Sequence, residues 1–202
     1  MSGVTTCWSC QGPLTSGALF CDTCGAPSAH LSDNPFVVFG LSQSYALDKQ
    51  ALEKTYFALS RQLHPDRFAA KSPKALMLAL QHTATLNAAY ATLKDDLNRA
   101  IYLLRAQGVN AFDEAGQGST PPALMATSFE LHEALEDATT PQALQSMGQE
   151  VTTRVEYCQK RLTQAFAAGD VPAATLAALE LKFLQTFRRD WQRKTKQMKD
   201  TA

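Results

Sequence analysis

Two apolar stripes of helical period, separated by the tripeptide His64-Pro65-Asp66, constrain the fold of this chain more than any other feature. Before the tripeptide, large apolar residues recur about once per helical turn: Leu52, Tyr56, Leu59 and Leu63. This spacing predicts one buried face of a helix, and Asp48 is a residue type that caps helix N-termini. Because Pro65 disfavours the helical conformation at His64, we expect the helix to end near Leu63.

A second helix is expected to begin after the tripeptide, at Ser72-Pro73, since serine suits the N-cap and proline the first helical position. Its apolar stripe consists of Leu76, Ala79, Leu80, Leu86, Tyr90 and Leu93. The two stripes together predict an antiparallel helical hairpin that exposes His64-Pro65-Asp66 at its tip.

The predicted tip carries one carboxylate within a collar of basic residues: Arg61, Arg67, Lys71 and Lys74. No nucleophile with an adjacent base stands near it, and Pro65 is expected to hold His64 and Asp66 apart. The tip is therefore better suited to recognition than to catalysis. A simple turn is the alternative interpretation, because proline and aspartate are common in turns.

The run from Arg61 to Phe68, followed by the helix containing Leu86-Asn87-Ala88-Ala89-Tyr90, resembles a J domain, the module through which co-chaperones stimulate ATP hydrolysis by DnaK-type chaperones. With the flanking segments 36–41 and 99–104, the chain is similar to the HscB-like co-chaperones of iron-sulfur cluster biogenesis over most of its 202 residues. The resemblance implies no catalytic residues. It implies contact with a DnaK-type (HscA-like) chaperone through His64, Pro65, Asp66, Arg61, Arg67 and Lys54.

The first thirty residues hold four of the five cysteines, in two Cys-x-x-Cys pairs: Cys7, Cys10, Cys21 and Cys24. Such pairs are typical of a tetrathiolate metal site, and a segment this short needs a metal or disulfides for stability. We predict structural zinc, with iron or two disulfides as alternatives. Gly12 and Gly25 are expected to adopt positive φ after each pair, and Trp8 and Phe20 to supply apolar cover. Some members of the HscB-like family carry a similar segment.

The C-terminal half predicts further helices. Asp96 is expected to cap a short helix to about Arg105, and Gly108 to end it. After a glycine- and proline-rich linker, three helices are expected to begin at Thr120-Pro121, at Thr140-Pro141, and at Asp170 with Pro172 in the first turn, and Gly169 is expected to end the second. Their shared core is expected to comprise Leu131, Leu135, Leu144, Met147, Val151, Val155, Leu162, Phe166, Leu176, Leu179, Phe183 and Phe187. Cys158 is expected to be an inert, buried or half-buried thiol.

The expected fold class is therefore all-α, with a J-domain helical hairpin and a C-terminal three-helix bundle, preceded by a small zinc-ribbon-like segment. The expected domains are residues 1–30 for the metal segment, 31–106 for the J domain, 107–122 for the linker and 123–202 for the bundle. A monomer is expected.

In the HscB-like family, the first and last bundle helices bind the iron-sulfur scaffold protein, the IscU-like client. The resemblance places this site here at Met125, Phe129, Glu130, Glu133 and Phe183. Met125, Phe129 and Glu133 are spaced to share one helical face. The chain departs from the family pattern at residues 126–128, where acidic or larger apolar residues are usual. Bundle core is the alternative interpretation for the apolar members, since spacing alone does not separate a core face from an exposed one.

Charge and composition weigh against other classes of protein. Lys+Arg and Asp+Glu both number 19, so the net charge is zero, which disfavours the alternative of a zinc-ribbon nucleic-acid-binding protein with a helical platform. A thiol oxidoreductase is disfavoured because no βαβ pattern surrounds the cysteine pairs. No apolar run approaches the length of a membrane span. Without a secretory signal, we expect a cytoplasmic protein, or a mitochondrial matrix protein if a presequence has been removed.

Overall fold

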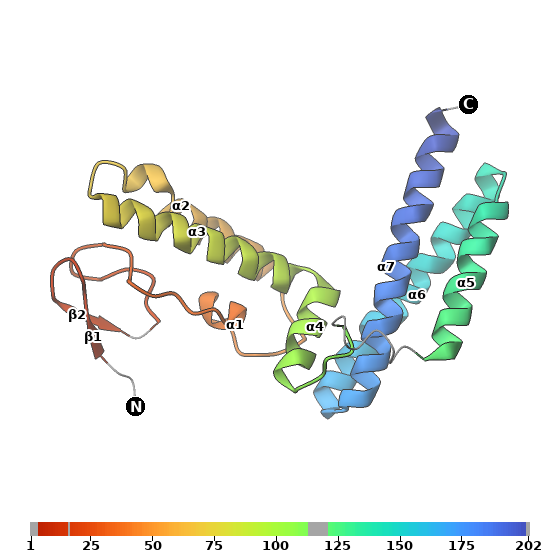
Figure 1. Cartoon of the computed structure of the whole chain (residues 1–202), viewed down its shortest axis with the longest axis horizontal. Helices are drawn as coiled ribbons and strands as arrows, with labels where there is room; N and C mark the ends of the chain where they lie inside the picture. Colours follow the sequence, from red (N-terminus) through yellow and green to blue (C-terminus); the bar gives the residue numbers. More distant parts are fainter. Residues whose placement is uncertain (1–3, 16, 113–120, 201–202) are drawn as a thin grey trace. The chain divides into compact units, whose positions relative to one another are not determined.

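The computed structural model describes residues 4–15, 17–112 and 121–200 (Figure 1). The chain divides into two compact units, residues 1–98 and residues 99–202. Apart from one two-stranded sheet, the regular structure of the described residues is helical, so the expected all-α fold is confirmed. None of the described helices is both long and apolar enough to cross a membrane. The bounds of the four expected segments stay predictions, and residues 113–120 of the expected linker lie outside the described part of the chain.

The first unit combines a small sheet with a helical hairpin. Its elements are β1 (Val4–Thr6), β2 (Pro13–Thr15), α1 (Pro35–Val38), α2 (Lys49–Gln62), the 3-10 helix η1 (Pro65–Arg67) and α3 (Pro73–Lys94), after which α4 (Asp96–Ala106) follows. β1 and β2 pair antiparallel, with Thr5 opposite Leu14. Helices α2 and α3 run side by side, joined through η1, and α1 packs against α3 (Figure 1). The predicted hairpin is thus present.

Local capping sets the ends of the hairpin helices. The Asp48 carboxylate accepts hydrogen bonds from the backbone N–H groups of residues 50 and 51 at 2.9 and 3.0 Å, and α2 stops before Leu63 as expected. Ser72 Oγ accepts from the Ala75 N–H at 3.1 Å at the start of α3. Each cap contributes about 1 kcal/mol. The predicted cap of α4 is wrong: Asp95 accepts from the Asn98 N–H at 2.8 Å, whereas Asp96 pairs with the Lys49 ammonium.

The buried stripe of α3 is displaced from the stripe that the sequence predicts. The buried positions of α3 are Ala75, Leu78, Ala79, His82, Leu86, Ala89 and Leu93. Leu80, expected in the core, is 50% exposed, because it lies one residue past the seam that starts at Ala75. Two alanines of that seam, Ala75 and Ala79, form a buried cluster with Phe68. The rings of Tyr56, on α2, and Tyr90, on α3, stack with centroids 4.0 Å apart, and this contact helps to hold the two helices together.

His82 is buried within this seam, and neither of its ring nitrogens has a hydrogen-bond partner among the described residues. Burial lowers the pKa of His82, since the charged imidazolium is poorly solvated there. The unfolded chain therefore binds a proton as the pH falls through about 6.5, while the folded chain stays neutral until a lower pH. We predict that the melting temperature falls as the pH drops from 7.5 to 5, and that His82→Leu reduces this fall. An identical pH dependence in both proteins, followed by circular dichroism, would contradict it.

The second unit contains a bundle of three long helices: α5 (Pro122–Asp137), α6 (Pro141–Ala168) and α7 (Val171–Asp200). Helix α7 packs against both α5 and α6 (Figure 1). Thr140 caps α6, Gly169 ends it with a φ of 68°, and Asp170 accepts from the Ala173 N–H at 3.0 Å at the start of α7, all as predicted. Thr120, the expected first residue of α5, lies outside the described residues, and Pro121 occupies the N-cap.

Alanines also shape the bundle core. Ala174, Ala177 and Ala178 are buried on α7, so α6 and α7 can approach closely. Leu176, predicted in the core, is 40% exposed because these smaller neighbours occupy the contact face. Cys158 is fully buried, as expected, and burial raises the pKa of its thiol to about 12. A thiol with that pKa is unreactive near neutral pH.

Candidate functional site

The hairpin tip is a short, hydrogen-bonded turn that presents a carboxylate to solvent. The N–H of Arg67 donates to the carbonyl of His64 at 3.0 Å, and the N–H of Phe68 donates to the carbonyl of Pro65 at 2.9 Å. The Asp66 side chain is 89% exposed. The expectation that Pro65 holds His64 and Asp66 apart is wrong, since His64 Nδ1 lies 3.5 Å from an Asp66 carboxylate oxygen and accepts from the Asp66 N–H at 3.4 Å.

The basic residues near the tip separate into two groups. Lys54 and Arg61 are exposed on α2, seven residues apart and hence on one face, and Arg67 is exposed in η1. The two lysines cover aromatic rings instead. Lys71 Nζ lies 5.2 Å from the centroid of Phe68, and Lys74 Nζ lies 4.6 Å from that of Trp8. Of the predicted collar, Arg61 and Arg67 are exposed, whereas the ammonium groups of Lys71 and Lys74 lie over aromatic rings.

The four N-terminal cysteines sit in two matching turns. The N–H of Gln11 donates to Cys7 O at 2.9 Å, and the N–H of Gly25 donates to Cys21 O at 2.8 Å. The residue after each second cysteine is left-handed, with φ of 60° at Gln11 and 67° at Gly25. The prediction of positive φ is thus right for Gly25 and wrong for Gly12, because the tight turn closes one residue earlier than expected.

These turns bring the four sulfur atoms together as a metal-binding cluster. All four Sγ atoms lie within 4.8 Å of one another, and two pairs, Cys7–Cys24 and Cys10–Cys21, are 3.7 Å apart. A metal bound tetrahedrally by four thiolates at about 2.3 Å requires sulfur atoms about 3.8 Å apart. The cysteines therefore fit one tetrahedral metal ion, a geometry shared by zinc and iron.

Backbone hydrogen bonds favour the thiolate form at two of the four cysteines. Those from the N–H groups of Cys10 and Ser9 lower the pKa of Cys7, and one from the N–H of Cys24 lowers the pKa of Cys21 to about 6. At Cys10, a backbone hydrogen bond from the N–H of Gly12 also favours the thiolate, but the neighbouring cysteine side chains outweigh it and raise the pKa to about 12. Thiolates are the form that binds metal. The same N–H groups would hold the sulfur ligands in orientation around a metal ion.

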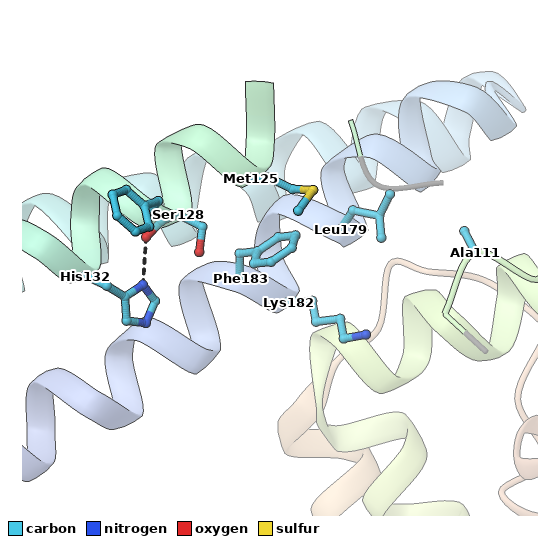
Figure 2. A pocket seen from close by; sticks show the side chains of 8 residues that line it. Ala111, Met125, Ser128, His132, Leu179, Lys182 and Phe183 are labelled. Atoms are coloured by element: carbon cyan, nitrogen blue, oxygen red, sulfur yellow. Dashed lines mark hydrogen bonds between the residues drawn. The ribbon is translucent and has the colours of Figure 1, made fainter. Parts of the chain in front are cut away.

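A groove of about 490 Å³ opens on the bundle between α5 and α7 (Figure 2). It is lined by Ala111, Met125, Ser128, Phe129, His132, Leu179, Lys182 and Phe183. Met125 and Phe129 are 57% and 70% exposed, so they are not bundle core. Figure 2 shows the Met125 side chain, from α5, directed toward the Phe183 ring, from α7.

Five residues were expected at a client site, and the structure gathers three of them in this groove: Met125, Phe129 and Phe183. Glu130 and Glu133 are exposed on α5 but do not line it. Sequence reasoning missed Lys182 and His132. His132 is fixed by a 2.7 Å hydrogen bond between its Nδ1 and the Ser128 carbonyl and by an edge-on contact with Phe187. Its spacing of seven residues from Met125 was the available signal.

Comparison with known proteins points to one family. The profile of a family described as the HSCB C-terminal oligomerisation domain matches residues 120–191. The co-chaperone protein HscB homolog of Cupriavidus taiwanensis is 35% identical over 163 residues, covering 79% of this chain and 92% of that protein. The homolog of Vibrio cholerae is 34% identical over 164 residues, covering 79% and 95%.

Solved structures agree in fold. The chaperone HscB from Vibrio cholerae superposes with a TM-score of 0.74 at 32% identity, covering 82% of this chain and 99% of that one. The human co-chaperone protein HscB superposes with a TM-score of 0.83 at 24% identity, covering 94% of this chain and 98% of that one. Because the superposition covers 94% of this chain, it includes at least part of the tetracysteine segment.

Proposed function

Because this chain belongs to the HscB family of co-chaperones, we propose that it couples ATP hydrolysis by a DnaK-type (HscA-like) chaperone to the handling of an iron-sulfur scaffold protein. The chain contributes two binding surfaces and no active site of its own. Joining client and ATPase raises the effective concentration of one at the other. The observation that carries the proposal is the presence of an exposed charged tip on one unit and an exposed apolar groove on the other.

The tip is the proposed chaperone contact. It consists of His64, Pro65 and Asp66 with the exposed cations Lys54, Arg61 and Arg67. An exposed carboxylate on a rigid turn is available for a charge-assisted hydrogen bond to a cation of the partner. The exposed cations on one face of α2 suit an acidic surface of the chaperone, and such complementarity mainly speeds association.

The groove is the proposed scaffold site. Met125, Phe129 and Phe183 supply apolar anchors, and the exposed Glu130 and Glu133 supply acidic groups beside them. Large apolar side chains exposed together at a concave surface are characteristic of interaction sites. Lys182, which lines the groove, adds a cation that can pair with an acidic group of the client.

The tetracysteine cluster is the proposed site of a structural zinc ion. Four thiolates without a further ligand suit zinc, and the segment's buried apolar cluster, Cys7, Leu14, Cys21 and Ala26, is too small a core for stability alone. We predict one zinc per chain in elemental analysis of the purified protein, and less than a tenth of that in a Cys7→Ser, Cys21→Ser variant. Stoichiometric iron, or no metal in the parent protein, would contradict the prediction.

Calorimetric titration with the two purified partners tests the function. The proposal requires that the chain bind the scaffold protein whether or not the ATP-bound chaperone is present, because the two surfaces belong to different units. Binding of only one partner, or exclusion of one by the other, would refute a linking role.

A further inference from the structure

The tetracysteine segment packs against the hairpin at Phe68, the residue that directly follows η1. Phe68 is 2% exposed and forms a buried cluster with Ala75 and Ala79, and Trp8 and Phe20 pack against this cluster. The Phe20 and Phe68 rings are stacked, with centroids 6.3 Å apart and an angle of 7° between their planes. The tetracysteine segment therefore covers Phe68, the residue at which the tip joins the rest of the hairpin.

Trp8 belongs to two clusters at once. It packs on the segment's own core, which includes Cys7 and Cys21, and also on the Phe68 cluster of the hairpin. Its indole N–H donates to the Pro27 carbonyl at 2.7 Å, which fixes the ring in place. Lys74 of α3 covers the same ring, so the contact combines apolar and cation-π components.

Both aromatic residues are direct chain neighbours of buried cysteines. Trp8 follows Cys7, and Phe20 precedes Cys21. The metal ion would thus fix the backbone from which each ring projects. Because so small a core depends on metal for folding, loss of the ion is expected to release both rings from Phe68.

Phe68 in turn is bonded to the tip through its backbone. Its N–H donates to the Pro65 carbonyl at 2.9 Å, and its carbonyl accepts from the Lys71 N–H at 3.0 Å. The side chain anchors η1, whose three residues bury nothing of their own. The order of the His64-Pro65-Asp66 turn therefore depends on what covers Phe68.

From these contacts we propose that the tetracysteine segment positions the hairpin tip, with Phe20 and Trp8 as positioning residues and Phe68 as the link, so that metal occupancy and tip order are energetically coupled. The coupling is a property of this chain alone, and its consequence for a chaperone rests on the proposed function. Coupling of this kind is reciprocal. The metal orders the tip, and the intact tip strengthens metal binding by the same factor.

The first test is hydrogen exchange of the full-length protein, zinc-loaded or stripped of metal under reducing conditions. The amides of Arg67, Phe68, Ala69 and Lys71 are hydrogen-bonded around the tip, and we expect each to exchange roughly two- to tenfold faster after stripping, the range expected for loss of one aromatic stack. Amides 177–187 of α7 should not change. Phe20→Ala should show fast exchange at the tip with zinc bound, and Phe20→Tyr should restore slow exchange. Equal rates at the tip with and without metal would overturn the proposal.

The second test is the zinc affinity of Phe68→Ala, measured by competition with a chromophoric chelator. Reciprocity predicts a roughly two- to tenfold weaker affinity, although Phe68 is not a ligand. The matched control is Phe57→Ala, an aromatic residue 51% exposed on α2, which should bind zinc like the parent. Phe68→Leu and Phe20→Ala provide the same comparison if Phe68→Ala does not fold. Parent-like affinity in the folded variants would overturn the coupling, whatever the outcome of chaperone assays.

Discussion

Replacing Asp66 by asparagine is expected to abolish stimulation of a DnaK-type chaperone's ATPase while leaving the hairpin folded. The substitution keeps the size of the side chain and removes its charge. A hydrogen bond to a charged group contributes about 1.5–3 kcal/mol, so the loss corresponds to roughly a tenfold to hundredfold weaker contact. Folding should be spared, because the turn is held by backbone hydrogen bonds from Arg67 and Phe68 and the carboxylate is 89% exposed. Stability should change by less than about 0.5 kcal/mol.

Steady-state ATPase assays with matched urea melts measure this prediction. Asp33→Asn is the control, since Asp33 is an exposed carboxylate in the same unit, in the segment before α1. It should stimulate like the parent. If Asp66→Asn stimulates like the parent, the tip is not the chaperone contact. If it loses stimulation only because the hairpin unfolds, the assigned role also fails.

Phe129→Ala is expected to weaken binding of the scaffold protein at least about tenfold, with little change in stability. Truncation of an aromatic anchor at the centre of an interface costs about 2 kcal/mol or more. The folded chain alone should lose little, because Phe129 is 70% exposed, whereas truncation of a buried phenylalanine costs about 3–5 kcal/mol. Phe183→Ala should weaken binding too, with a larger cost in stability, since Phe183 is partly buried.

The matched control is Tyr157→Ala. Tyr157 is 60% exposed on α6 of the same unit and does not line the groove. Calorimetric titration of the scaffold protein, beside thermal melts of each variant, separates the outcomes. Unchanged affinity of Phe129→Ala, or equal losses for Phe129→Ala and Tyr157→Ala, would remove the groove as the client site.

Helix ends were the most predictable part of this fold, because capping is a local interaction. Asp48, Ser72, Thr140 and Asp170 all accept hydrogen bonds from the first turns that they precede, as their positions in the sequence indicate. At the start of α4, where two adjacent aspartates could act as the cap, the predicted residue, Asp96, was wrong. Asp95 caps α4 because Asp96 pairs with Lys49, a residue 47 positions away that local pattern does not reveal.

The composition of the cores was harder to predict, since apolar patterns draw attention to large residues. In both α3 and α7 the contact seam is built partly from alanines, and the nearby Leu80 and Leu176 are exposed. His82 completes the seam of α3 although histidine is usually placed at the surface. Close approach of two helices, which decides these positions, depends on both partners at once.

In the candidate sites too, features set by local sequence were predicted, whereas contacts between distant segments were not. Spacing alone predicted the four converging cysteines, because each pair forms its own turn. It did not predict that Trp8 and Phe20 cover Phe68, a contact between segments 48 residues or more apart in the chain. Nor did it establish that Met125 and Phe129 are exposed, since an amphipathic helix in a bundle can turn either face inward.

The central claim, that one chain links the chaperone's ATPase to the scaffold protein, is tested most directly by ATP turnover of a purified DnaK-type chaperone with this chain, the scaffold protein, or both. We predict stimulation by the chain alone and, with both present, a stimulation greater than the sum of the two separate effects, lost in Asp66→Asn. The added effect of the scaffold should also be lost in Phe129→Ala, while stimulation by that variant alone persists. No stimulation by the chain, or merely additive effects of chain and scaffold, would contradict the account.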